Sequence, residues 1–154
     1  MKIFIMRHGE AEHFAASDAE RALTVGGRSA SISVAKACTQ QGFSQFDKVL
    51  VSPYLRAQQT WKAISQEFTA NQVETCDDIT PYGQSPQVFD YVNALIELEK
   101  PESILLVSHL PLVSYLTAEF VTDIVPPMFP TSGLVCIEFD AKKQNGTLLW
   151  NIHS

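Results

Sequence analysis

The sequence predicts an α/β protein with three layers, in which helices cover both faces of a mostly parallel central sheet. Short apolar runs typical of strands alternate along the 154 residues with longer segments of helical spacing. Strands separated by helices form βαβ units, and such units build parallel sheets. With 45% hydrophobic and 18% charged residues, the chain can bury a core, and its length predicts a single domain over residues 1–154.

Six apolar runs predict the strands, in the order residues 2–6, 48–51, 73–76, 103–107, 134–139 and 147–152. The first and fourth runs are continuously apolar, as expected of strands that are buried on both faces. Asn145-Gly146 stands between the last two runs, and this dipeptide favours a tight hairpin turn. We therefore expect the last two strands to pair through that turn.

Four segments between these runs predict helices: residues 26–41, 54–68, 86–98 and 111–120. Thr24 is placed to cap the first helix, and Gly42 is placed to end it. Pro53 and Pro111 stand near the starts of the second and fourth helices, where proline is accepted. The expected inward-facing side chains include Leu55, Ile64 and Phe68 in the second helix and Val88, Val92, Leu95 and Ile96 in the third.

Charge and cysteine content exclude several classes of protein. Eleven Lys and Arg against 17 Asp and Glu give a net charge of −6, so nucleic acid is not expected as a partner. Cys38, Cys76 and Cys136 are too far apart for a disulfide framework or a structural zinc site, and we expect buried thiols. The apolar runs are too short for a membrane span or a signal peptide, which predicts a cytoplasmic protein without membrane contact.

Basic side chains follow three of the predicted strands where each strand ends. Arg7 and His8 follow the first strand, Arg56 follows the second, and His109 follows the fourth. Ligands of parallel sheets bind beyond the carboxyl ends of the strands, so these four residues are expected to share one crevice. Arginine matches phosphate oxygens with a planar fork, and a neutral imidazole can attack phosphorus. The sequence therefore predicts phosphoryl transfer, with arginines stabilising the charge in place of a metal.

The same positions resemble the signature motifs of the histidine phosphatase superfamily, which includes cofactor-dependent phosphoglycerate mutases and many phosphatases. These motifs read Arg7-His8-Gly9-Glu10, Ser52-Pro53-Tyr54-Leu55-Arg56-Ala57-Gln58-Gln59-Thr60 and Ser108-His109. Further stretches are similar to a branch of small bacterial phosphohistidine phosphatases: Arg21-Ala22-Leu23-Thr24, Ser108-His109-Leu110-Pro111-Leu112-Val113 and Pro126-Pro127-Met128-Phe129. The resemblance covers nearly the whole chain and implies a phosphoglycerate mutase-like fold.

The resemblance also implies a role for each of the four basic residues. His8 would be the catalytic nucleophile, and Arg7 and Arg56 would bind the phosphoryl oxygens. His109 would donate a hydrogen bond to the same oxygens. No cofactor is implied.

Arg21 follows the nucleophile in the same loop and is a further candidate for substrate binding. It either borders the crevice together with Asp18 or forms a plain surface ion pair with it. His13 and His153 lack a motif and are expected to be ordinary surface residues. His8 and His13 have no third ligand at a usable spacing, so no metal site is predicted.

Four other residues in or near the motifs have plainer expected roles. Ser52 and Ser108 are expected to hold loop backbone, because no GxSxG nucleophile motif is present. Met128 and Phe129, in the proline-rich loop over residues 125–130, could form a rim for a partner, but core packing is the favoured interpretation.

One departure from the family pattern bears on the substrate. Mutases and broad phosphomonoesterases of the superfamily place a glutamate before a glycine to protonate the leaving oxygen, whereas alignment on Gly83 puts Ile79 there. Asp78 is adjacent, but on a strand-like stretch its side chain would face away, and neither it nor Asp77 is expected to act as an acid. A protonated phosphohistidine releases neutral imidazole without an acid. The missing acid therefore favours cleavage of a P–N bond.

The spacing of the motifs leaves no room for an inserted cap domain, so a phosphohistidine on another protein could enter the crevice. The resemblance implies that this partner is a histidine-containing phosphotransfer domain of a phosphorelay, and the protein itself is expected to be a monomer. Two alternatives stay open. One is a small-molecule phosphomonoesterase of the same superfamily, and the other is a phosphate-binding module without turnover, which would not need the nucleophile His8.

Overall fold

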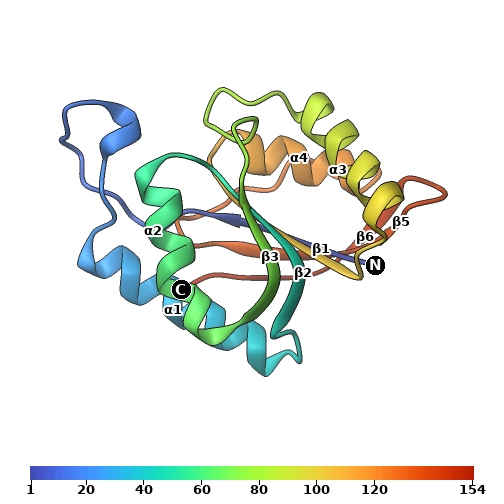
Figure 1. Ribbon diagram of the computed structural model, residues 1–154, viewed down its shortest axis with the longest axis horizontal. Coiled ribbons are helices and arrows are strands. Elements are labelled where there is room, and N and C mark those ends of the chain that lie inside the picture. Colours follow the sequence, from blue (N-terminus) through green and yellow to red (C-terminus); the bar gives the residue numbers. More distant parts are fainter.

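A computed structural model describes all 154 residues and shows one central sheet between two layers of helices (Figure 1). The sheet has six strands in the order β3-β2-β4-β1-β5-β6. The strands are β1 (Lys2–Arg7), β2 (Gln45–Val51), β3 (Thr69–Thr75), β4 (Ser103–Ser108), β5 (Leu134–Asp140) and β6 (Asn145–Ile152). Strands β3, β2, β4 and β1 pair in parallel, whereas β5 is antiparallel to both β1 and β6. The predicted mostly parallel sheet is confirmed.

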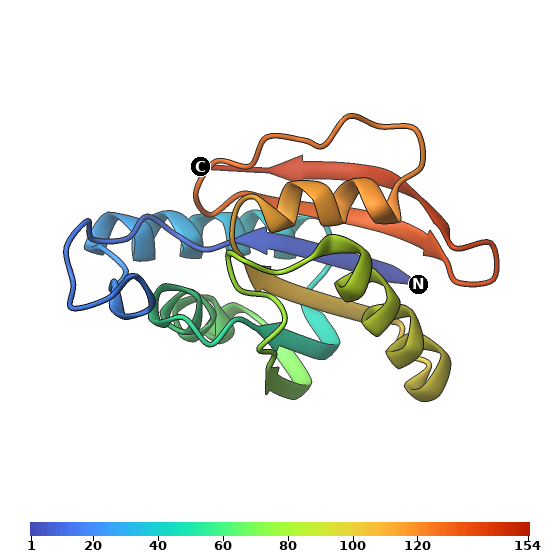
Figure 2. The ribbon, with the colours of Figure 1, turned by 90° about the horizontal axis from the view of Figure 1, so that it is seen from above.

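Each strand from β1 to β4 is followed by one helix, and the helices divide between the two faces of the sheet (Figure 2). They are α1 (Val25–Gln40), α2 (Leu55–Ile64), α3 (Ser85–Glu99) and α4 (Leu112–Phe120). Successive side chains of β1 point to opposite faces of the sheet, so they enter two separate hydrophobic cores. Ile3 and Ile5 pack with α3 and α4, whereas Phe4 and Met6 pack with α1 and α2. No cap domain interrupts these units, and none of the helices is long and apolar enough to cross a membrane.

The residues predicted to begin and end α1 do so, whereas one predicted inward-facing residue of α2 is exposed. The hydroxyl of Thr24 accepts a hydrogen bond of 2.8 Å from the Gly27 N–H, and Gly42 follows the helix in a left-handed conformation with φ of 96°. The inward position predicted for Leu55 is wrong, because this residue opens α2 at the rim of the sheet and is exposed. The three cysteines are free and buried, as expected.

The predicted hairpin is present, but its turn lies elsewhere. Residues 141–144 form the turn, with Gln144 in a left-handed conformation, whereas Asn145 and Gly146 pair with the end of β5. A Cβ atom on Gly146 would lie 2.8 Å from the carbonyl oxygen of Glu138. Glycine is therefore required at position 146 because the backbones of β5 and β6 approach closely there. The Asn-Gly dipeptide alone does not show whether its glycine serves such an approach or a turn.

Three parallel strands, β1, β2 and β4, end at the same edge of the sheet, and their following loops form the candidate site. The loop over residues 8–24 is the longest of them, and it carries a short 3₁₀ turn at Asp18–Glu20. Figure 2 shows this loop extending beyond the sheet edge (blue).

Candidate active site

His8 follows β1 directly and is held by both neighbouring segments. Its backbone N–H donates to the carbonyl of Ser108 at 3.0 Å, and its carbonyl accepts from the N–H of Ser132 at 3.0 Å. The Nδ1 atom lies 2.7 Å from the carbonyl oxygen of Gly9, which can only accept. We therefore assign the imidazole proton to Nδ1. The lone pair is left on Nε2, the atom that faces the site.

Gly9 allows helix α1 to pack onto the nucleophile loop. A Cβ atom at this position would lie 2.7 Å from both the Gly27 carbonyl oxygen and the Ser31 hydroxyl. The Gly9 N–H donates to the Thr60 hydroxyl at 3.0 Å, and this hydroxyl donates to the carbonyl of Arg56 at 2.7 Å. Thr60 thus joins the first motif to the second and fixes the distance between them.

Arg56 lies in the first turn of α2, with its guanidinium buried beside the imidazole of His8. Its Nε donates to Nε2 of His8 at 3.3 Å. Its Nη1 donates to the carbonyl oxygen of Asp18 at 2.7 Å, and its Nη2 lies 3.1 Å from the Asp18 carboxylate. The guanidinium carbon also lies 5.0 Å from the centre of the Tyr54 ring. These contacts hold one positive charge directly against the free imidazole nitrogen.

Arg7, the last residue of β1, brings a second guanidinium to the same edge. Its Nη1 donates to the carbonyl of Phe129 at 3.0 Å, whereas its buried Nε has no hydrogen-bond partner. Burial lowers the pKa of Arg7, and the charge of Arg56 lowers it further. A buried charged donor without a partner is costly, so Arg7 is poised for an anion.

His109 follows β4 and is oriented by the hydroxyl of Ser52. Its Nε2 lies 2.7 Å from that oxygen, which also accepts the N–H of Tyr54 at 3.2 Å. The Ser52 hydroxyl hydrogen has no acceptor other than Nε2, so we let it donate there and assign the imidazole proton to Nδ1. This Nδ1 is buried without a partner, and the ring centre lies 5.0 Å from that of His8. The second histidine thus offers an unused N–H donor.

Electrostatics keeps both imidazoles neutral. Burial lowers the pKa of His8 to about 4, against the hydrogen bond to Gly9, and the charges of Arg56 and Arg7 act in the same direction as burial. Burial also lowers the pKa of His109 to about 3, helped by His8 and Arg56. At neutral pH the site therefore combines two uncharged rings with positively charged guanidiniums, an arrangement that favours a dianionic guest.

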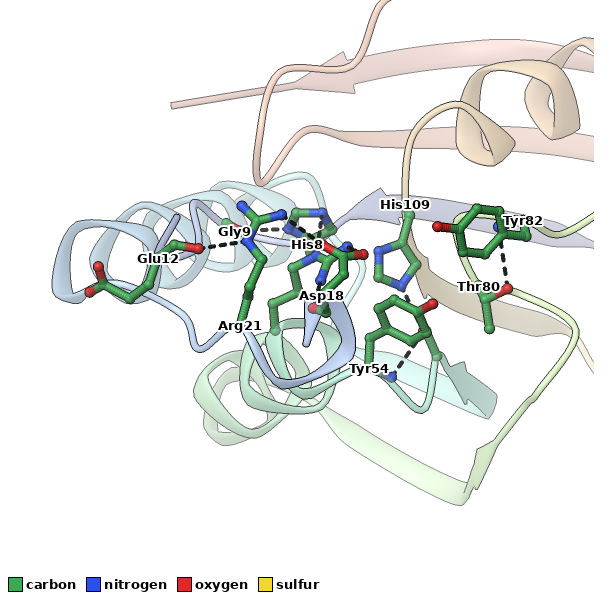
Figure 3. A network of polar contacts seen from close by, with 11 residues as sticks. His8, Gly9, Glu12, Asp18, Arg21, Tyr54, Thr80, Tyr82 and His109 are labelled. Atoms are coloured by element: carbon green, nitrogen blue, oxygen red, sulfur yellow. Dashed lines mark hydrogen bonds and ion pairs between the residues drawn. The ribbon is translucent and has the colours of Figure 1, made fainter. Parts of the chain in front are cut away.

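Arg21 forms the expected ion pair with Asp18, and its side chain lies in the site network drawn in Figure 3, whereas its role in substrate binding stays a prediction. Its Nη1 lies 3.0 Å from Oδ1 of Asp18, and its Nε donates to the carbonyl of Glu12 at 2.6 Å. Oδ2 of the same carboxylate lies 3.1 Å from Nη2 of Arg56, so Asp18 joins the two arginines. The pKa of Asp18 is lowered, first by the hydrogen bond from Arg21 and also by that from Arg56, so the carboxylate stays ionised.

No carboxylic acid takes the position where the family pattern has a glutamate. Ile79 is completely buried in the core under α3 and α4, and Asp77 and Asp78 are exposed. The strand-like stretch expected here is wrong, because β3 ends at Thr75 and turns follow. The Ser108 hydroxyl donates to the carbonyl of Ile79 at 2.7 Å, so it holds loop backbone as expected.

Three residues that Figure 3 draws around His109 had no site role predicted from the sequence. Tyr54 packs its ring edge-on against this imidazole, with ring centres 5.0 Å apart. Thr80 and Tyr82 lie on the opposite side of His109 in Figure 3. The only available signal was the position of Tyr54 inside the second motif, since the loop of Thr80 and Tyr82 carries no motif.

The remaining candidates lie outside the site. His13 and His153 are exposed, as expected. Phe129 is buried, as expected, but Met128 is 85% exposed, so its expected core packing is wrong. The carbonyl of Phe129 is bound to Arg7, which fixes this segment while its ring enters the core and the neighbouring side chain faces solvent. No three His, Cys, Asp or Glu side chains gather in a way that could hold a metal ion.

Comparison with known proteins identifies the family. The family model of the histidine phosphatase superfamily (branch 1) matches residues 3–80. Phosphohistidine phosphatase SixA of Escherichia coli is 40% identical over 153 residues, which cover 99% of this chain and 93% of the relative. A SixA homolog of Haemophilus influenzae is 39% identical over 150 residues, covering 93% and 91%. The chain belongs to the histidine phosphatase superfamily, as its motifs predicted.

A solved structure extends the similarity to three dimensions. The protein histidine phosphatase SixA complexed with tungstate superimposes with a TM-score of 0.93 at 40% sequence identity. The match covers 99% of this chain and 97% of that one. The α/β architecture without a cap domain is therefore shared with this relative.

The neutral histidines predict a loss of stability in mild acid. An unfolded histidine titrates near pH 6.5, whereas the native pKa values of His8 and His109 are about 4 and about 3. Below pH 6.5 the unfolded chain binds protons that the native chain does not, so the free energy of unfolding falls by on the order of 1 kcal/mol per pH unit for each histidine. We expect melting temperatures to fall between pH 6.5 and 4, with a shallower slope for His109→Gln. Equal slopes of melting temperature against pH for the wild type and His109→Gln would contradict a buried, neutral His109.

Proposed function

We propose that the protein is a phosphohistidine phosphatase that removes the phosphoryl group from a phosphohistidine on another protein. The observation that carries this proposal is Nε2 of His8, to which we assign no proton, in a buried group of donors whose neighbouring carboxyl group, Asp18, is kept ionised by two arginines. The similarity to SixA supports the same substrate class. Arg7, Arg56 and His109 bind the phosphoryl oxygens in this proposal, and Arg21 borders them.

Binding of the phosphoryl group satisfies the donors that lack a partner. The Nε–H of Arg7 and the Nδ1–H of His109 both gain an acceptor oxygen. Arg56 contributes a charged edge beside the reacting nitrogen. Hydrogen bonds to charged groups contribute about 1.5–3 kcal/mol each, and these donors are already in place before the substrate arrives.

The first chemical step transfers phosphorus from the substrate imidazole to His8. The Nε–H of Arg56, which donates to Nε2 of His8 in the free site, turns to a phosphoryl oxygen and releases the Nε2 lone pair. This lone pair attacks phosphorus in line, and the electron pair of the breaking P–N bond stays with the leaving nitrogen. If the substrate ring is protonated on its other nitrogen, it leaves as neutral imidazole. His8 keeps its Nδ1–H, so the phosphorylated ring is a cation, and the carbonyl of Gly9 stabilises it through the 2.7 Å contact.

The second step returns the enzyme to its starting state. Water attacks the phosphorus of phosphorylated His8, and the electron pair of the breaking P–N bond returns to Nε2 while Nδ1 keeps its proton. The phosphoryl group leaves as dihydrogen phosphate, which carries both protons of the water. Arg7, Arg56 and His109 stabilise the charge on the transferring group in both steps. No step requires a metal ion.

Cleavage of a P–N bond and of a P–O bond differ in whether the leaving group needs a proton. Alkoxide needs a proton from an acid, whereas neutral imidazole does not. Asp18 is the carboxylate that reaches Arg56, and its ion pairs with Arg21 and Arg56 keep it ionised, so it has no proton to give. The geometry therefore favours phosphohistidine over alkyl phosphates. We infer that the partner is a histidine-containing phosphotransfer domain, because a site without a cap domain is accessible to a phosphohistidine on a protein surface. We also propose that the protein acts as a cytoplasmic monomer.

The test compares turnover of a phosphohistidine protein with a panel of phosphate esters, with and without EDTA. We expect phosphohistidine to be hydrolysed fastest, aryl phosphates more slowly, and alkyl phosphates slowest. EDTA is expected to leave all rates unchanged. Alkyl phosphates hydrolysed as fast as phosphohistidine would indicate a phosphomonoesterase, and phosphate binding without any turnover would indicate a binding module.

Two matched variants serve as controls for a hidden acid. Asp77→Asn and Asp78→Asn are expected to change phosphohistidine turnover by less than about twofold, because both side chains are exposed on turns. Removal of a working general acid costs about 10²- to 10⁴-fold. A loss of that size on an ester substrate would overturn the P–N assignment and leave the phosphatase assignment in place.

A further inference from the structure

The carboxylate of Asp18 binds the same edge of Arg56 that faces the nucleophile. Nε and Nη2 of a guanidinium lie on one edge, and together they can bind two oxygens side by side. In Arg56 this edge lies 3.3 Å from Nε2 of His8 and 3.1 Å from Oδ2 of Asp18. A phosphoryl group attacked by His8 also lies against this edge. Asp18 Oδ2 therefore stands where a phosphoryl oxygen would bind.

The other oxygen of the same carboxylate pairs with a second arginine. Asp18 Oδ1 lies 3.0 Å from Nη1 of Arg21, so the carboxylate bridges two guanidiniums, as a phosphate group does. Figure 3 shows Asp18 in the same network of polar contacts as His8, to which Arg56 joins it. The charge of Asp18 also acts on the imidazole of His109. In its charge, its partners and its place, the carboxylate resembles a bound anion.

The turn that carries Asp18 can move without disturbing either core. None of the residues in the turn Asp18–Glu20 is buried, and residues 12–20 are exposed throughout. The side chain of Asp18 is itself 46% exposed. Segments with few buried contacts open at low free-energy cost. A dianion attracts Arg56 more strongly than a singly charged carboxylate, so a phosphoryl group can displace Asp18.

We propose that Asp18 is a specificity-determining residue that competes with phosphoryl groups for Arg56. This inference rests on the proposed function. Free phosphate and small phosphate compounds have only their phosphoryl contacts with which to displace the carboxylate. A phosphohistidine on a protein surface also contacts the exposed loop over residues 12–20, and these contacts favour displacement of the turn. Asp18 thus weakens the binding of small phosphates, including the product, more than that of the protein substrate.

The competition is tested by measuring the dissociation constant of inorganic phosphate by calorimetry, which needs no turnover. Asp18→Asn keeps the shape of the side chain and removes its charge, and we expect it to bind phosphate at least about 10-fold more tightly than the wild type. The control is Glu20→Gln, which removes the same charge from the same turn but contacts only the Ser17 hydroxyl, at 2.9 Å. We expect this control to change phosphate affinity by less than about twofold.

Two results would overturn the competition. If Asp18→Asn binds phosphate equally or more weakly, Asp18 merely positions the arginines. If Glu20→Gln strengthens phosphate binding as much as Asp18→Asn does, the effect arises from the net charge of the protein and not from the position of Asp18. Thermal unfolding of each variant shows whether the fold is kept, and Asp18→Glu, which restores the charge, is expected to restore weaker phosphate binding.

Selectivity is read from a second measurement, the ratio of kcat/KM for a phosphohistidine protein to that for free phosphohistidine. Asp18→Asn is expected to lower this ratio at least about fivefold, because the small substrate gains more from removal of the competitor. An unchanged ratio would overturn the specificity role. If no form of the protein hydrolyses phosphohistidine but Asp18→Asn still binds phosphate more tightly, the proposed function fails and the competition at Arg56 stands.

Discussion

Replacement of His8 by Ala or Asn is expected to lower phosphohistidine turnover by more than about 10⁴-fold, since both variants remove the nucleophilic imidazole nitrogen beside Arg56. The loss should appear in kcat as well as in kcat/KM, because the remaining donors still bind the phosphoryl group. The wild type, quenched under alkaline conditions in which phosphohistidine survives, is expected to carry a phosphoryl group on His8. Neither variant is expected to carry one.

The Asn variant separates chemistry from folding. His8 follows β1 on a loop, yet it is only 7% exposed, so Ala leaves the Gly9 carbonyl without its donor at a cost of about 1–3 kcal/mol. The Asn amide can reach the same carbonyl and is expected to melt closer to the wild type. His13→Ala, at an exposed histidine of the same loop, is the control and should retain activity. Activity retained by both His8 variants would exclude this residue as the nucleophile.

The sequence predicted the sheet well because burial and periodicity agree in its strands. The runs 2–6 and 103–107 lie at the centre of the sheet as β1 and β4, where both faces are covered and a continuous apolar run is required. The hairpin turn was misplaced because Asn-Gly favours both a turn and a close approach between strands. Only the paired register decides between the two, and it depends on residues far apart in the chain.

The positions of the four basic residues were predictable because each lies close to the carboxyl end of a parallel strand: Arg7 ends β1, His8 and His109 follow β1 and β4, and Arg56 lies in the first turn of the helix after β2. A strand end has little freedom, so Arg7, His8, Arg56 and His109 had to meet once the strands were parallel and adjacent. The path of Asp18 could not be predicted, because it lies in a long polar loop without periodicity. The tautomers of His8 and His109 could not be predicted either, because each depends on a single hydrogen bond, to a carbonyl for His8 and to a hydroxyl for His109.

Arg56→Lys is expected to lower kcat/KM by about 10- to 150-fold although the positive charge is kept. The guanidinium uses three nitrogens at once, with donors to the nucleophile His8, to the carbonyl of Asp18 and to its carboxylate. A lysine ammonium is a single point and cannot hold two oxygens side by side, so the phosphoryl group loses its bidentate contact.

The matched control for this prediction is Arg28→Lys, the same exchange at an arginine that is exposed on α1. It is expected to leave kcat/KM within about twofold of the wild type. Because Arg56 is 4% exposed, Lys at this position also buries an ammonium with fewer partners, and a modest fall in melting temperature should accompany the loss of activity. A variant that melts lower but keeps the wild-type kcat/KM would show that Arg56 supports the loop of Asp18 and takes no part in stabilising the transferring phosphoryl group.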